Sequence, residues 1–211
     1  MGPDGWSELM AGLRLTLWLS VASGLLSLVF GTLIGIGRVA PWLPLRALCE
    51  GYIEFFRNIP LLIAMFFVFN GLPFAGIRLD FVPSAIAALT AYTAAYVAEA
   101  VRAGIEAISA GQIEAGRSLG MDYFKILRFV LLPQAFRMII PPLGNLFIAL
   151  TKNTSVASAI AVQELLYKSQ LIESRTFSGN VFLIAGLLYL VLTIPMSLAV
   201  NAIEKRLVIQ H

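Results

Sequence analysis

Charged side chains are scarce in this chain of 211 residues. Only 13% of the residues are Asp, Glu, Lys or Arg, whereas 59% are hydrophobic and the mean hydropathy is +0.85. A soluble core of this size cannot bury that much apolar surface. The composition therefore argues against a soluble protein and predicts a membrane protein in which residues 1–211 form a single transmembrane domain.

Cysteine and histidine are each present once. Cys49 alone cannot form an internal disulfide or a cysteine metal cluster. His211 stands at the end of the sequence, which argues against histidine-based catalysis or a histidine metal site. The sequence also lacks a GxxxxGK[ST] phosphate loop, a hydrolase elbow and paired carboxylates. We therefore expect no catalytic residue, no metal site and no cofactor bound by this chain itself.

Long apolar runs predict five transmembrane helices. A helix needs about 20 predominantly apolar residues to cross the roughly 30 Å of hydrocarbon in a bilayer. Such runs lie at about residues 12–37, 52–72, 83–106, 135–152 and 180–203. The first contains Gly31 and Gly35, a GxxxG pair that permits another helix to approach closely. The expected fold is an all-α membrane bundle.

The basic residues favour one orientation of this bundle. Five spans place the two ends on opposite sides, and cytoplasmic segments carry an excess of Lys and Arg. More basic residues become cytoplasmic when the N-terminus lies outside, including those between residues 109 and 128. These residues follow the membrane topology and form no single basic stripe, so nucleic-acid binding is not expected. The prediction is a multi-pass protein whose C-terminus is cytoplasmic.

A polar segment with several glycines, residues 109–128, separates the third and fourth runs. Ser109 followed by Gln112 has the form of a capping box that starts a short helix, and Gly120 can end that helix in the left-handed conformation. Asp122 can then cap a second short helix. Taken alone, the pattern is also typical of an ordinary amphipathic helix at the membrane surface.

The spacing from Glu114 onward resembles the EAA loop of the membrane subunits of bacterial ABC importers. The matching positions are Glu114, Ala115, Gly120, Leu132 and Pro133. Gly116 stands where the family usually has Ala, and Val130 where it has Ile. The resemblance implies a type I ABC importer transmembrane domain whose loop at 109–128 holds the coupling helix. The residues that it implies in ATPase coupling are Glu114, Ala115, Gly116, Arg117, Gly120 and Asp122.

Two further segments resemble the polar amino acid branch of these permeases. They are residues 94–115, and residues 54–62, which read EFFRNIPLL. Arg57 and Asn58 stand beside Pro60 within or at the edge of a span, where polar side chains usually face a cavity or a partner group. A place on the substrate path is one interpretation of Arg57. The others are snorkelling to the inner interface and a salt bridge to Glu54.

Charges of alternating sign mark the end of the third run. Glu99, Arg102 and Glu106 can form a ladder on one face of a helix. The ladder has a purely structural interpretation. It also has a functional one, in which it stiffens a lever that leads to the coupling loop.

Residues 151–155, TKNTS, form a polar run between apolar stretches. The importer family has a similar segment beside its translocation path, and this resemblance implies Lys152, Asn153, Thr154 and Ser155 as path residues. The alternative is a loop in water, with Lys152 interacting favourably with the C-terminal end of a helix dipole. Lys152 would favour anionic or amide amino acids.

The resemblance as a whole implies the permease subunit of an ATP-driven amino acid importer in the bacterial inner membrane, with glutamate, glutamine or another polar amino acid as substrate. Its partners would be two ATPase subunits that bind ATP and Mg, a second identical or homologous permease, and an extracytoplasmic amino acid binding protein. The competing interpretation is an ion-gradient-driven secondary transporter, for which Arg57 and Lys152 would be groups on an ion path.

Overall fold

The computed structural model describes residues 3–207, and within that range it is helical with no β-strand. The α-helices are α1 (Pro3–Arg38), α2 (Leu43–Asn58), α3 (Leu61–Phe66), α4 (Phe81–Glu106), α5 (Ala110–Ser118), α6 (Tyr123–Ile126), α7 (Leu132–Asn153), α8 (Leu165–Thr176) and α9 (Asn180–Leu207). Short π- or 3₁₀-helical turns are η1 (Phe67–Gly71), η2 (Leu72–Ala75), η3 (Leu127–Leu131) and η4 (Thr154–Ile160). The predicted all-α class is confirmed.

Four stretches are long and apolar enough to cross a membrane as they stand. They are Asp4–Arg38, Phe81–Glu106, Tyr123–Ile160 and Asn180–Leu207. A fifth crossing is formed if the bent pair Leu43–Asn58 and Leu61–Ala75 counts as one span. The third stretch is longer than the expected fourth run, because η3 continues directly into α7 and joins it to the polar loop.

The expected single helix at 52–72 is wrong. The chain turns by 110° between Leu43–Asn58 and Leu61–Ala75. Pro60 has no N–H to donate, and its ring pushes the preceding residue out of the helical region. Ile59 accordingly has φ −101° and ψ 146°, and Pro60 is also extended with ψ 139°. One proline therefore converts a span into a broken element.

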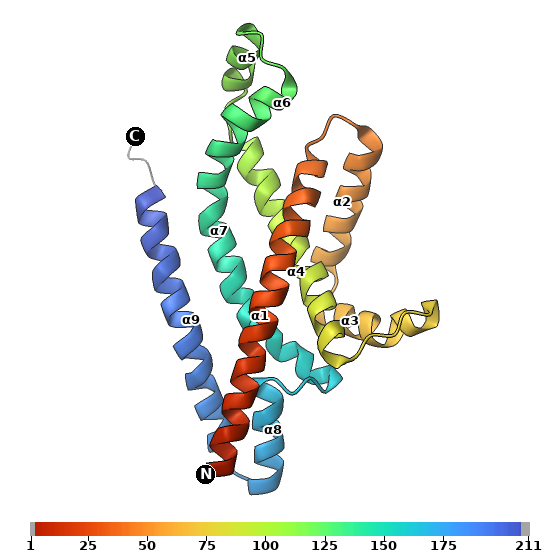
Figure 1. The fold of residues 1–211 in the computed structure, drawn as a ribbon, viewed down its shortest axis with the longest axis vertical. Helices are drawn as coiled ribbons and strands as arrows, with labels where there is room; N and C mark the ends of the chain where they lie inside the picture. The colour runs from red at the N-terminus through yellow and green to blue at the C-terminus, as the bar shows by residue number, and fades with distance from the viewer. Residues whose placement is uncertain (1–2, 208–211) are drawn as a thin grey trace.

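The helices α1 and α4 form the centre of the bundle and run in the same direction (Figure 1). A Cβ on Gly31 would lie 2.6 Å from Val97 Cβ and 2.7 Å from the Ala94 carbonyl oxygen. One turn later, a Cβ on Gly35 would lie 2.7 Å from the Ala98 carbonyl oxygen. The GxxxG pair thus brings two backbones together within one chain, against the alanine-rich face of α4.

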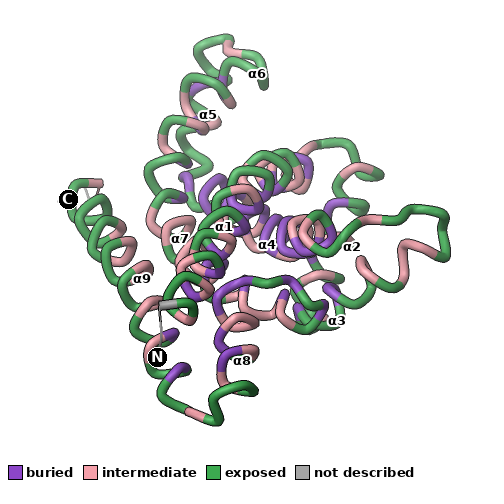
Figure 2. The backbone as a smooth tube through the Cα atoms, turned by 60° about the horizontal axis from the view of Figure 1, so that its bottom comes forward, coloured by how far each residue is buried: buried purple, intermediate pink, exposed green. Residues whose placement is uncertain are grey.

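The polar loop and the helix α8 lie at opposite ends of the molecule (Figure 1). The loop helices α5 and α6 project beyond the ends of α4 and α7, while α8 lies beside the start of α1 and of α9. The first turns of α1 and the last turns of α9 are therefore at opposite ends. Figure 2 shows that α9 is exposed along most of its length, whereas the inner faces of α1 and α4 are buried.

We expect Gly31→Ala to lower the melting temperature of the protein in detergent. The new methyl would meet a backbone carbonyl that cannot rotate away, and such overpacking typically costs about 1–3 kcal/mol. The gain in helix propensity from Gly to Ala is about 1 kcal/mol at most, so the clash should dominate. Gly51→Ala in α2 is the matched control, since nothing lies within 4 Å of a Cβ there. Equal melting temperatures for the two variants would contradict this packing.

Candidate coupling and translocation sites

The candidate coupling element consists of two short helices joined by a tight turn. The Ser109 hydroxyl accepts a hydrogen bond from the Gly111 N–H at 3.3 Å and starts α5. Gly120 has φ +75°, the left-handed conformation that ends the helix, and the Met121 N–H donates to the Gly116 carbonyl at 3.0 Å. The Asp122 carboxylate accepts from the Lys125 N–H at 2.9 Å and starts α6. This hydrogen bond lowers the pKa of the Asp122 carboxyl.

The expected capping box is only half formed. The Gln112 side chain does not return to the backbone of Ser109 but bonds to the side chain of Gln134 on α7. Gln134 also donates to the Val130 carbonyl at 2.9 Å. The pair ties the start of α5 to the helix that re-enters the membrane. Sequence spacing cannot reveal such a bond, because it spans 22 residues.

The predicted coupling residues divide into a buried one and an exposed set. Gly116 is buried, and a Cβ there would lie 3.1 Å from Ile126 Cγ1, so Gly116 holds α5 against α6. The exposed residues are Glu114, Ala115, Arg117, Gly120 and Asp122. Within residues 3–207, Glu114 and Arg117 form no ion pair, although their spacing allows one. Their charges are therefore available to a partner.

Large apolar side chains accompany these exposed polar groups. Leu119 is 81% exposed and Phe124 is 77% exposed, and Tyr123 stacks edge-on against Phe124. Exposed apolar side chains that are grouped on a projecting element and surrounded by polar residues mark an interaction surface. The tip of the loop thus has the composition of a docking site.

An ion-pair chain connects the broken span to α4. Arg57 Nη1 lies 3.6 Å from Glu99 Oε2, and Glu99 Oε1 lies 2.5 Å from Arg102 Nη2. Arg102 also bonds to Glu106 one turn further along. Of the interpretations of Arg57, the salt bridge is the one observed, but its partner is Glu99 and not Glu54. The Glu54 carboxylate instead accepts from the Asn58 amide at 3.0 Å.

A small polar cavity lies between α4 and α7. Its volume is about 110 Å³, and its lining consists of Tyr92, Thr93, Tyr96, Leu146, Ala149, Leu150 and Asn153. The hydroxyls of Tyr92 and Tyr96 are hydrogen-bonded at 3.0 Å, and the guanidinium of Arg57 lies 6.0 Å from the centre of the Tyr96 ring. Two of the predicted path residues, Arg57 and Asn153, therefore approach the same group of tyrosines.

The other predicted path residues do not line this cavity. Thr154 is buried and donates to the Thr151 carbonyl at 2.8 Å, and Ser155 donates to the Lys152 carbonyl at 2.7 Å. Both hydroxyls are thus turned back onto the chain. Lys152 is exposed in the last turn of α7, where its charge is favourable to the helix dipole. Asn58 faces its own helix through Glu54.

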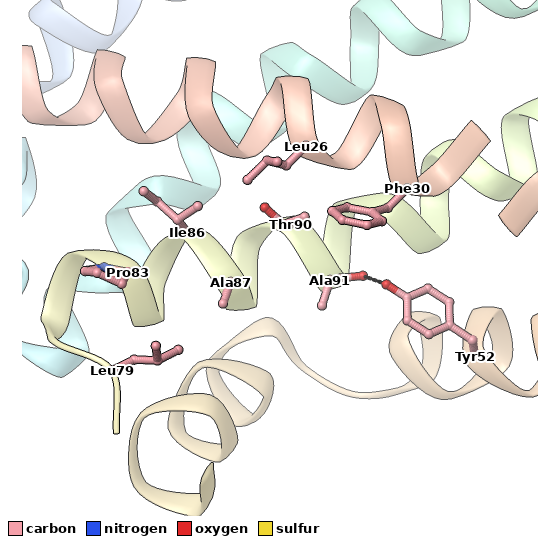
Figure 3. A pocket seen from close by; sticks show the side chains of 9 residues that line it. All are labelled: Leu26, Phe30, Tyr52, Leu79, Pro83, Ile86, Ala87, Thr90 and Ala91. Carbon is pink, nitrogen blue, oxygen red and sulfur yellow. Dashed lines mark hydrogen bonds between the residues drawn. The ribbon is translucent and has the colours of Figure 1, made fainter. Parts of the chain in front are cut away.

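A larger cavity of about 580 Å³ opens beside α1, α2 and α4 (Figure 3). Its lining is Leu26, Phe30, Tyr52, Leu79, Pro83, Ile86, Ala87, Thr90 and Ala91. Tyr52 and Thr90 bring the only side-chain hydroxyls to this wall, and the Tyr52 hydroxyl is occupied by the Ala91 carbonyl at 2.7 Å. A wall of this composition suits hydrocarbon and not a charged solute, so the smaller cavity is the candidate for a polar substrate.

Glu164 is a buried charged residue that the sequence analysis missed. It starts α8, and its carboxylate accepts from the N–H groups of Leu166 and Tyr167 at 2.9 and 2.8 Å and from the Tyr189 hydroxyl at 2.9 Å. The neighbouring Leu165 N–H donates to Thr16 on α1 at 3.2 Å. The sequence does contain a signal for Glu164. It is an acidic residue directly before a helix-forming segment, which is a capping position. The network joins α1, α8 and α9.

Burial raises the pKa of the Glu164 carboxyl, and the hydrogen bonds from the backbone oppose this shift. The folded state therefore holds the proton more tightly than the unfolded state. The resulting stabilisation of the folded state is complete below pH 4.5, the ordinary pKa of a glutamate carboxyl. It is lost as the pH rises through the raised pKa of Glu164. We expect the melting temperature of Glu164→Gln to lack this pH dependence.

The measurement is a series of melting temperatures in detergent that begins below pH 4.5. Wild type should lose stability relative to Glu164→Gln as the pH rises. Glu204→Gln, at an exposed position of α9, should follow wild type. Parallel curves for wild type and Glu164→Gln would show that the carboxyl does not titrate in this way.

Long apolar helices, a broken span and a projecting polar loop are together typical of a transmembrane transport protein whose loop is exposed for interaction. The family model described as a binding-protein-dependent transport system inner membrane component matches residues 13–209. The chain therefore belongs to this family, the membrane components of ABC importers, as its EAA spacing predicted.

Individual relatives agree with this assignment. The probable glutamine ABC transporter permease protein GlnM of Bacillus subtilis (strain 168) is 45% identical over 205 residues, which cover 97% of this chain and 95% of that protein. The glutamate transport system permease protein GluC of Corynebacterium efficiens is 36% identical over 223 residues, with coverage of 97% and 98%.

Solved structures confirm the predicted type I importer fold. A chain in the crystal structure of an amino acid ABC transporter with histidines has a TM-score of 0.89 and 33% identity, and the match covers 95% of this chain and 94% of that one. An inward-facing structure of the MetNI methionine ABC transporter gives a TM-score of 0.81 at 22% identity, covering 99% and 100% of the two chains. The second likeness concerns the fold alone.

Proposed function

We propose that this chain lines the translocation path of an ATP-driven importer of glutamine, glutamate or another polar amino acid. The names of its relatives support this substrate class. The observation that carries the proposal is the connection of an exposed docking loop to a polar cavity by one helix, α4. That helix holds the ladder from Glu99 to Glu106 and also the tyrosines of the cavity.

Energy would enter through the loop. ATP and Mg²⁺ bind to two separate ATPase subunits, and α5 and α6 dock on them through the exposed face that includes Glu114, Arg117 and Phe124. The turn at Gly120 fixes the angle between the two helices. Because Gln112 is bonded to Gln134, a push on α5 also acts on the start of α7.

The path would be completed by a second permease subunit. A cavity of 110 Å³ is smaller than the sites of about 300 Å³ or more that enclose whole small molecules. Asn153 would offer an amide to a substrate amide or carboxylate. Arg57, neutralised by Glu99 at 3.6 Å, would be released to an anionic group when the helices move. An extracytoplasmic binding protein would deliver the amino acid.

The same arrangement supports one orientation in the membrane. Docking on a cytoplasmic ATPase requires the α5 end of the molecule to lie in the cytoplasm, which places the start of α1 outside (Figure 1). The excess of Lys and Arg in the segments at the α5 end supports this orientation. The chain would then lie in the bacterial inner membrane with its C-terminus in the cytoplasm.

Gly120→Val should weaken co-purification of the ATPase and uncouple ATP hydrolysis from uptake. Valine is strained at φ +75°, so the turn that presents α6 must change. Gly76→Val is a matched control, because Gly76 has φ +81° and equally open surroundings but lies far from the loop in sequence. Coupled uptake by Gly120→Val would contradict the docking role. Uptake by wild type that follows an ion gradient and needs no ATPase would favour the secondary-transporter alternative.

Asn153→Ala should raise the KM for amino acid uptake about tenfold, because one hydrogen bond to a polar or charged substrate is worth roughly 1–3 kcal/mol. Ser155→Ala is the control, since that hydroxyl is turned onto the Lys152 carbonyl. Uptake is measured with radiolabelled glutamine and glutamate in vesicles that contain the complete transporter. A change in KM for Ser155→Ala but not for Asn153→Ala would show that the substrate does not pass through this cavity.

A further inference from the structure

An apolar cavity lies between α7 and α9, and Leu28 of α1 contributes to its wall. Its volume is about 240 Å³, and it is lined by Leu28, Ile140, Leu143, Gly144, Phe147, Val200 and Ile203. A Cβ on Gly144 would lie 2.4 Å from Val200 Cγ2, so the two helices are in direct contact beside the cavity. The lining contains no polar side chain. A molecule that fills this cavity must therefore be hydrocarbon.

Two arginines lie just beyond the same end of this cavity. The helices α7 and α9 run in opposite directions, and the contact of Gly144 with Val200 sets their register. Arg137 precedes Ile140 by one helical turn, and Arg206 follows Ile203 by one turn, so both residues stand on the α5 side of the cavity. Both side chains are exposed, and in residues 3–207 neither has a carboxylate within salt-bridge distance.

The local charge is positive despite one acidic neighbour. Lys205 is exposed next to Arg206, while Glu204 is the only acidic residue in this turn of α9. With Arg137, this gives three cations and one anion beside a hydrocarbon-lined cavity. Arginine binds phosphate oxygens through two parallel N–H groups, which suits it to a phosphate that is held by neighbouring helices.

We propose that an anionic phospholipid occupies this site, with its phosphate between Arg137 and Arg206 and one acyl chain in the cavity. Basic pockets between transmembrane helices on the cytoplasmic side recognise lipid headgroups in this way. The proposed orientation decides which leaflet of the bilayer supplies this lipid. The existence of the lipid site does not depend on that orientation. Such a lipid would bridge α7 and α9. Its effect would be large because the buried residues of α9, Val181 and Ala185, lie at the opposite end of that helix.

A second copy of this chain fits the site less well than a lipid. Copies related by a two-fold axis present the same patch to each other. Docking through this face would bring Arg137, Lys205 and Arg206 of one subunit close to the same cations of the other. Like charges brought together in this way are repulsive, whereas a lipid phosphate neutralises them.

Lipid retention by the complete transporter tests the proposal. The transporter is reconstituted in nanodiscs of equal parts phosphatidylglycerol and phosphatidylcholine, extracted into detergent, and weighed by native mass spectrometry. We expect wild type to retain phosphatidylglycerol preferentially. The variant Arg137→Gln/Arg206→Gln should lose that preference about thirtyfold, because each of the two basic residues contributes on the order of 1 kcal/mol to anionic lipid binding.

Two further variants separate the site from general surface charge. Arg46→Gln/Arg128→Gln removes two exposed cations elsewhere toward the α5 end of the molecule and should leave retention unchanged. Ile203→Trp keeps the cations but fills the cavity, and should reduce retention of phosphatidylglycerol with no loss of ATPase co-purification. Equal losses in both double variants would overturn the proposal, as would equal retention of the two lipids by wild type. Cross-linking between two copies through residue 203 would identify a second subunit as the occupant.

Discussion

Close contact between the backbones of α1 and α4 is the constraint on which the other features depend. In lipid there is little hydrophobic force between helices, so association relies on packing at short range. Gly31 and Gly35 supply that contact by leaving room for the Ala94 and Ala98 carbonyls. Because α4 is fixed in this way, the residues on its other faces have defined positions. One face, which carries Tyr92, Tyr96 and Glu99, presents the tyrosines to α7 and Glu99 to Arg57.

The break at Pro60 is the second determinant, and it works together with the first. It ends α2 at Asn58 and places Arg57 beside Glu99 of α4. A charge within a membrane span is costly unless it is paired. Glu99 supplies the pairing, while Arg102 and Glu106 extend it toward the loop. The ion pairs thus form a continuous chain from the helix break to Glu106, at the end of α4 that leads into the proposed coupling loop.

The general plan could be predicted from sequence because it depends on local patterns. Apolar runs gave the positions of the long helices, and Gly120 and Asp122 marked the turn of the loop through conformational preference and capping. The expected single helix over residues 52–72 was wrong, because Pro60 breaks the helix within an otherwise apolar run. The partners of Arg57, Gln112 and Glu164 could not be predicted, since each contact joins residues that are distant in the sequence. Such contacts depend on helix packing, which local patterns do not encode.

The role of the Arg57–Glu99 ion pair in coupling can be measured directly. We would determine the ATP hydrolysed per amino acid transported in proteoliposomes for wild type, Arg57→Gln, Glu99→Gln and the double variant. If the pair links the helix break to α4, each single substitution should raise this ratio. The ratio of the double variant should be no higher than that of either single variant. Effects that add in the double variant would show that the two residues act independently and would contradict the link.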